Sequence, residues 1–293
     1  MAYIILQLGL LYAIPALAVS ISFRVVGFPD LTPDGSFTLG AAVSAVFLLH
    51  GFHPLLAMLV ALVAGACAGF LTAVLHTRLG VSKLLSGIII MTMLYSVSLR
   101  VMGTSNLSLR RLSTFLGSLI ETRGNLMTTA TIAVFCSALV LIVWSLLKLR
   151  IGLFLRAVGD SNSALTQRGV RTEPLYLIGL AITNGLAALG GVFVGQFQGF
   201  VDIYMGSGLV IISLAAIIIG ETIIRPERVI TLITAPVLGM IIYQAVIAIA
   251  LRLRLAATDV KVATAILVLL FVAVDRVRFR LGIANRQIGN RDI

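Results

Sequence analysis

The residue types that most often carry catalysis or bind metals are present, but their spacing does not fit either task. The histidines His50, His53 and His76 do not form a His-Glu-x-x-His motif, which would place two metal ligands on one helix face. Cys67 and Cys136 lie inside apolar runs without a second cysteine nearby, so no disulfide framework or redox pair is indicated. These residues therefore do not predict an enzyme or a metal centre.

The sequence also does not contain a nucleotide-binding loop. A P-loop needs a Gly-Lys pair before Ser or Thr, so that backbone amides and an ammonium group can hold phosphates. The three lysines are Lys83, Lys148 and Lys261, and none of them follows a glycine. Charged residues stand mostly at the ends of apolar runs, so no carboxylate relay for a coupling ion is indicated. Any energy for uphill transport must therefore come from another polypeptide.

One polar stretch, "GLFLRAVGDSNSALTQRGV" (152–170), interrupts the apolar runs. Asp160, Ser161 and Asn162 offer side-chain oxygens that could cap a helix start. Gly169 suits the left-handed position just after a helix end. A helix of about two turns is therefore predicted over 162–168. The stretch is either an ordinary basic loop at the lipid surface or a short docking helix for a cytosolic partner.

The composition places the chain in a membrane. Of its 293 residues 59% are hydrophobic and 11% are charged, and the mean hydropathy is +1.11. A soluble domain is typically about a quarter charged. The net charge of +11 is assigned to cytoplasmic loops and lipid headgroups, not to nucleic acid, because Lys and Arg fall between the apolar runs.

An all-α polytopic fold in a single transmembrane domain is expected, because a spanning helix needs about 20 apolar residues. About nine spans are predicted, at 1–23, 36–50, 55–79, 83–102, 126–147, 174–196, 207–224, 229–251 and 259–275. Placing the N-terminus outside puts most of the 22 Lys and Arg residues, and the C-terminus, on the cytoplasmic side.

An internal repeat is predicted from two similar stretches, "PDGSFTLGAAVSAVFLL" (33–49) and "YMGSGLVIISLAAIII" (204–219). Both run from Gly-Ser into a short helix of small residues, and they enter the membrane from opposite sides in the predicted topology. This indicates an inverted repeat of four plus one plus four spans, in which such interrupted segments mark a translocation site. The substrate-pathway candidates are Asp34, Phe37, Thr38, Asp202, Tyr204 and Ser207.

The repeat divides the single domain of residues 1–293 into six parts. These are the first repeat 1–102, the outer loop 103–125, the linking span 126–147, the cytoplasmic loop 148–173, the second repeat 174–275 and the cytoplasmic tail 276–293. Glycines at four-residue spacing let helix backbones approach closely in a bilayer. The glycines assigned to helix packing are Gly65, Gly69, Gly191, Gly195 and Gly199.

The chain resembles the permease subunits of ATP-binding-cassette (ABC) importers in the branched-chain amino acid and ribose family. The segments that carry this resemblance are "LRAVGDSNSALTQRGV", "LAALGGVFVGQFQGF", "GSGLVIISLAAIIIGE", "VVGFPDLTPDGSFTLGAA" and "GVSKLLSGIIIMTML". They extend over nearly the whole chain, and the tryptophan- and tyrosine-type uptake permeases look most similar. One departure is Gly-Glu-Thr at 220–222, where the family usually has a second glycine.

The resemblance implies a type II ABC importer permease in the cytoplasmic (inner) membrane of the cell. The polar stretch would be its ATPase-coupling helix, with the residues Arg156, Ala157, Gly159, Asp160, Ser161, Asn162, Ala164, Leu165, Arg168 and Gly169. ATP and Mg²⁺ would be bound by a dimer of separate cytosolic ATPase subunits, with no cofactor in this chain. A second permease copy, most simply an identical one, and an extracytoplasmic substrate-binding protein would complete the importer.

The solute expected from the resemblance is small, an amino acid of the aromatic or branched-chain type. Alternating access would move it inward. A stand-alone channel or facilitator for a small polar solute is the alternative. Solute flux without ATP or a partner would distinguish it.

Overall fold

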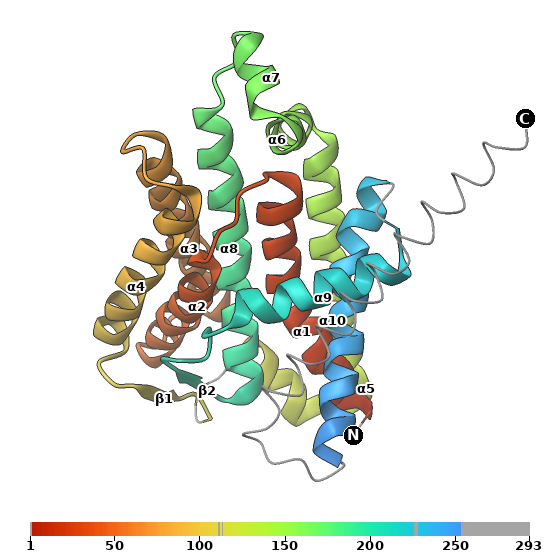
Figure 1. Cartoon of the computed structure of the whole chain (residues 1–293). Helices are drawn as coiled ribbons and strands as arrows, with labels where there is room; N and C mark the ends of the chain where they lie inside the picture. The colour runs from red at the N-terminus through yellow and green to blue at the C-terminus, as the bar shows by residue number, and fades with distance from the viewer. Residues whose placement is uncertain (1, 111, 113, 226–227, 253–293) are drawn as a thin grey trace, which may run out of the picture.

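The computed structural model describes residues 2–110, 112, 114–225 and 228–252, which form a bundle of helices (Figure 1). The helices of the first half are α1 (Ala2–Ser20) with its π-helical extension η1 (Ile21–Val25), α2 (Thr32–Leu49), α3 (Pro54–Thr77) and α4 (Lys83–Met102). The remaining helices are α5 (Phe115–Lys148), α6 (Arg150–Asp160), α7 (Asn162–Gln167), α8 (Glu173–Gln198), α9 (Leu209–Ile223) and α10 (Val229–Arg252).

A small antiparallel sheet joins the two halves of the chain. Its strands are β1 (Asn106–Ser108) and β2 (Phe200–Asp202), and Leu107 lies opposite Val201. In Figure 1 this sheet lies at one end of the bundle and α6 and α7 lie at the other. We call these ends the sheet end and the α7 end.

The fold is all-α and polytopic, as the sequence predicts. Among the described residues seven helices are long and apolar enough to cross a membrane. A helix is present at eight of the predicted spans. The ninth predicted span, 259–275, and the tail 276–293 lie outside the described residues.

Two helices differ from the predicted spans in length. The long helix α5 begins at Phe115, because Thr114 Oγ1 accepts a hydrogen bond of 2.8 Å from Gly117 N and so caps it. Residues 115–125, predicted as outer loop, are therefore helical. The helix α9 has 15 residues, about 22 Å in length, which is less than the roughly 30 Å of a bilayer core. It is therefore a helix that starts or ends inside the bundle.

The helices of the two halves pack against each other in a reciprocal pattern. The third helix of the first half, α3, packs against α8, the first helix of the second half. Reciprocally, the third helix of the second half, α10, packs against α1. The short helices α2 and α9 each pack against the third helix of their own half. A repeat of the predicted kind would give such a reciprocal pattern, and the inverted repeat itself stays a prediction.

Gly65 and Gly69 bring the backbones of α3 and α8 together. A Cβ atom at Gly69 would lie 2.0 Å from the carbonyl oxygen of Leu180, and one at Gly65 would lie 2.4 Å from that of Asn184. Neither position has room for a side chain. In a bilayer, where apolar surface gains little by leaving lipid, such close van der Waals packing holds helices together.

The other predicted packing glycines lie along α8 and play different parts. A Cβ atom at Gly191 would lie 1.9 Å from the carbonyl oxygen of Phe37, so α2 and α8 also touch through backbone. Gly195 has more space, with Val201 Cγ2 at 3.1 Å from such an atom. Gly199 is not part of this face. It ends α8 in the left-handed conformation, with φ of 76°.

Replacing Gly69 by leucine tests the α3–α8 contact. The side chain would collide with the backbone of α8, and overpacking costs about 1–3 kcal/mol or more. We expect Gly69→Leu to lower the thermal unfolding temperature of the protein purified in detergent. Cys67→Leu is the control, because Cys67 lies on the exposed side of the same helix turn. Equal unfolding temperatures for the two variants would contradict the close contact.

Candidate functional site

Asp30 holds the start of α2. Its carboxylate accepts a hydrogen bond of 2.9 Å from the backbone nitrogen of Thr32 and another of 2.9 Å from Asn184 Nδ2 in α8. The residue is fully buried. Buried carboxylates are costly unless every oxygen is hydrogen-bonded. Asp30 therefore fixes the entry of α2 against the middle of α8.

Asp34, one turn later in α2, holds the start of α9 in the other half of the chain. One carboxylate oxygen accepts from Gly208 N at 2.9 Å and the other accepts from Val210 N at 2.7 Å. The first amides of a helix have no partner within that helix, and an acidic group there also matches the helix dipole. Asp34 thus caps a helix that begins 175 positions further along the chain, at Leu209.

The loop before α9 lies directly on α2. Gly206 N donates to Thr38 Oγ1 at 3.1 Å, and Thr38 Oγ1 in turn donates to the carbonyl oxygen of Asp34 at 3.3 Å. A Cβ atom at Gly206 would lie 2.0 Å from that same carbonyl oxygen. The two stretches that the sequence identifies as a repeat therefore meet at the starts of their helices.

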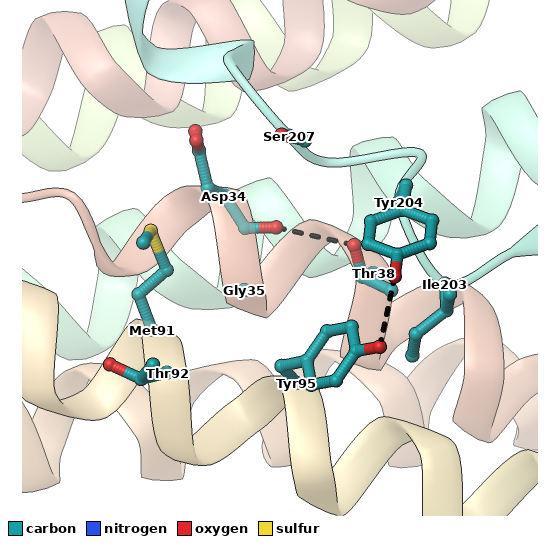
Figure 2. Close-up of a pocket in the computed structure, with 9 residues that line it drawn as sticks. All are labelled: Asp34, Gly35, Thr38, Met91, Thr92, Tyr95, Ile203, Tyr204 and Ser207. Atoms are coloured by element: carbon teal, nitrogen blue, oxygen red, sulfur yellow. Dashed lines mark hydrogen bonds between the residues drawn. The ribbon is translucent and has the colours of Figure 1, made fainter.

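A cavity of about 250 Å³ opens where these helix starts meet α4 (Figure 2). Its lining residues are Asp34, Gly35, Thr38, Met91, Thr92, Tyr95, Ile203, Tyr204 and Ser207. The hydroxyl groups of Tyr95 and Tyr204 lie 3.2 Å apart. In Figure 2 the carboxylate of Asp34 points away from this tyrosine pair. The space beside the tyrosines is therefore lined by hydroxyl and apolar groups.

Four of the six predicted pathway residues line this cavity: Asp34, Thr38, Tyr204 and Ser207. The other two lie elsewhere. Phe37 is fully buried and stacks on Tyr12, with ring centroids 6.2 Å apart. Asp202 belongs to β2, where its carboxylate accepts a hydrogen bond of 2.8 Å from Tyr204 N.

The wall that α4 contributes was not identified from the sequence. Met91 and Tyr95 stand four residues apart and so share one face of this helix. That spacing is visible in the sequence, but it does not say which helix the face meets. Only the packing of α4 on α2 brings these residues to the cavity.

At the α7 end, the predicted coupling element consists of two helices. The helix α6 buries Gly152, Leu155 and Val158 along one face. The chain then turns at Ser161, whose φ of −159° and ψ of 96° break the helix. The predicted coupling residues, from Arg156 to Gly169, are therefore divided between two helices, because Ser161 leaves the helical conformation to cap α7.

The helix α7 has the bounds and caps that the sequence suggests. Ser161 Oγ accepts from Ala164 N at 3.3 Å, and Gly169 follows the helix with φ of 77°. No residue of α7 is buried. Of the remaining predicted contact residues, Asp160 is exposed, and Arg156 is half-buried with no hydrogen-bond acceptor for its Nε atom among the described residues.

Comparison with known proteins identifies the family of this chain. The profile of the family described as branched-chain amino acid transport system, permease component, matches residues 1–275. The chain belongs to this family. It is therefore an ABC importer permease of type II, a multi-pass membrane subunit and not an enzyme. No solved structure matches the chain significantly.

Two of the relatives are permeases of different import systems. A tyrosine transport system permease protein of Clostridioides difficile is 36% identical over 280 residues, which cover 96% of this chain and 93% of that protein. An autoinducer 2 import system permease protein, LsrC, of Photorhabdus luminescens is 26% identical and matches 73% of this chain and 62% of its own length. An uncharacterised protein of Rickettsia prowazekii is 39% identical over 71% of this chain and 72% of its own.

Removing the carboxylate of Asp34 tests its role in this permease. We expect Asp34→Ala to destabilise the protein by about 0.5–2 kcal/mol, the usual cost of losing a helix cap. Asp34→Asn should cost less, because its one oxygen can still accept a bond. Thermal unfolding in detergent measures both. Thr92→Ala is the control and should unfold at the wild-type temperature, because Thr92 lines the same cavity but its hydroxyl bonds within α4, to the carbonyl oxygen of Ile88. Wild-type stability of Asp34→Ala would contradict the capping role.

Proposed function

We propose that this chain carries the translocation pathway of an importer for an amino acid, driven by a separate ATPase that docks on α7. In this proposal the ATPase dimer binds ATP and Mg²⁺, and its closure moves α6 and α7. The halves related by the repeat then rock about the pathway, which gives alternating access. Membership of the family shows that the chain is an importer permease. The docking of the ATPase, the identity of the solute and the orientation in the membrane are proposed.

The exposure of α7 is the observation that carries the docking proposal. All its residues except Leu165 are exposed, and Leu165 is partly buried. An isolated helix of six residues is not stable in water by itself. Its caps, its packing through Leu165 and the helix α6 hold it in place (Figure 1). A rigid, polar helix held away from the bundle favours a protein partner over a lipid-covered loop.

Sidedness and assembly follow from this docking. If the ATPase is cytosolic, the α7 end is cytoplasmic, and the N-terminus, which lies toward the sheet end in Figure 1, is on the outside. The excess of Lys and Arg in the predicted inner loops supports this orientation. A substrate-binding protein would then dock at the sheet end. A second, identical permease would supply the other half of the pathway.

The solute is proposed to be an amino acid with an apolar or aromatic side chain. The support is the cavity, where Tyr95 and Tyr204 stand with ring centroids 5.8 Å apart beside Met91 and hydroxyl groups. The tyrosine transport permease that resembles this chain over nearly its whole length points to the same class. L-Tyrosine is therefore the first solute to test.

Ala164→Arg tests the docking of the ATPase on α7. Because Ala164 is exposed, the longer side chain meets nothing in this chain, but it would collide with a partner surface that encloses α7. A clash that costs about 1.4 kcal/mol already weakens binding tenfold. We expect the variant to insert into the membrane normally and to lose more than about tenfold of its bound ATPase. ATP-driven uptake of L-tyrosine into proteoliposomes should fall with it.

Ser105→Arg is the matched control, because Ser105 is also exposed but lies in the loop before β1, at the sheet end. It should retain ATPase in full. Wild-type ATPase binding by Ala164→Arg would contradict the docking site. L-Tyrosine flux through the purified chain without ATP would instead identify a facilitator.

A further inference from the structure

Residues 24–34 connect α1 to α2 in a conformation that their sequence dictates. Gly27 takes the left-handed conformation with φ of 63°, which stops the helix. Phe28 precedes Pro29, and a residue before proline is disfavoured in a helix. Ser22 fixes the turn through hydrogen bonds with the backbone of Phe28, at 2.6 Å and 2.9 Å. We call residues 24–34 the connecting segment.

The start of the connecting segment touches α6 through backbone. A Cβ atom at Gly159 would lie 2.1 Å from the carbonyl oxygen of Val25, and one at Gly27 would lie 3.1 Å from Gly159 Cα. Gly159 stands one residue before the end of α6, and α7 follows directly. If α6 and α7 shift, the backbone of α6 therefore pushes directly on the backbone of the connecting segment, with no side chain between them.

The helices α4 and α8 hold the start of the connecting segment in position. Lys83 at the first turn of α4 donates to the carbonyl oxygen of Gly27 at 3.0 Å and lies over the ring of Phe28, 5.6 Å from its centroid. A Cβ atom at Gly179 in α8 would lie 2.8 Å from Val26 Cγ2. These contacts leave the segment little freedom to move independently of its neighbours.

The two ends of the connecting segment hold the two ends of α9. Arg24 pairs with Glu221 in the last turn of α9, and Asp34 caps its first turn. A helix of 15 residues is about 22 Å long. Through these two contacts the segment reaches both ends of α9.

We propose that the connecting segment transmits displacement of α6 to α9 and to the cavity beside it. Arg24 and Asp34 are its positioning residues at the two ends of α9, and Gly159 with Val25 is its contact to α6. This inference rests on the proposed function, since it needs an ATPase that moves α6 and α7. Because α9 begins at the cavity, tilting it changes access to Ser207 and Tyr204.

Arg24 is the residue of choice for a test, because its side chain is 49% exposed and replacing it opens no cavity in the core. Its partner Glu221 is 16% exposed. The protein provides a matched control at the same end of the bundle. Arg78 in the turn after α3 pairs with Glu173 at the start of α8, with a distance of 3.0 Å, so this pair joins α3 to α8 and not the connecting segment to α9.

The experiment measures access to the cavity in the complex with the ATPase that co-purifies. Cys67 and Cys136 are first replaced by serine and Ser207 by cysteine. The rate at which a water-soluble maleimide labels Ser207→Cys is then compared with and without ATP. We expect ATP to change this rate, and Arg24→Glu to reduce the change by about fivefold or more, the usual range of coupling between sites. The amount of bound ATPase should stay the same.

Arg24→Lys keeps the positive charge and should retain most of the response to ATP, and Arg78→Glu should retain all of it. A full response in Arg24→Glu, or a loss of bound ATPase in that variant, would overturn the inference. A Ser207→Cys parent that binds ATPase but shows no response to ATP would overturn it too. If no ATPase co-purifies with the Ser207→Cys protein, the proposed function itself is contradicted.

Gly159→Ala provides a second test at the other contact. Alanine is favoured over glycine within a helix, so α6 itself is not weakened. The added methyl group must instead push α6 away from the backbone of Val25. We expect bound ATPase with a reduced response of Ser207→Cys to ATP. An unchanged response would show that this contact does not transmit.

Discussion

The first amides of a helix that starts inside an apolar bundle have no water to bind, so the protein must supply an acceptor. In this permease Asp34 does so for α9, with both carboxylate oxygens on backbone nitrogens of the loop and the first turn. Asp30 does the same for α2. Both acids come from one short stretch, so the position of each short helix depends on the same part of the backbone.

The need to cap the starts of α2 and α9 explains where the cavity lies and how it is connected to the α7 end. Because the starts of α2 and α9 meet, the cavity lies where the two halves of the chain join. The glycines of α3 and α8 allow the two halves to pack closely through backbone. The connecting segment extends from this junction to α6, which places the proposed site of energy input and the proposed pathway on one continuous piece of chain.

The sequence predicts the helices and their repeat because long apolar runs and small-residue motifs are local patterns. It predicts α7 for the same reason, since Ser161 and Gly169 are local capping signals. The helix α6 before it was not predicted, and the choice among Asp160, Ser161 and Asn162 as the cap of α7 was left open, because all three can cap and only packing selects one. Phe37 does not line the cavity, and Tyr95 was not identified as lining it, because which face of a helix meets a cavity depends on tertiary contacts. The hydrogen bond from Gly208 to Asp34 joins residues 174 positions apart, and no local sequence pattern reveals such a contact.

The central claim is that a cytosolic ATPase sits on α7. The most direct measurement places a photo-crosslinking amino acid at Gln167, an exposed residue of α7, in cells that carry the complete transport system. The account predicts one covalent product, in which mass spectrometry identifies a protein with a P-loop. The same amino acid at Ser105, near the sheet, should not give this product. Crosslinks to the ATPase from Ser105 and none from Gln167 would contradict the account.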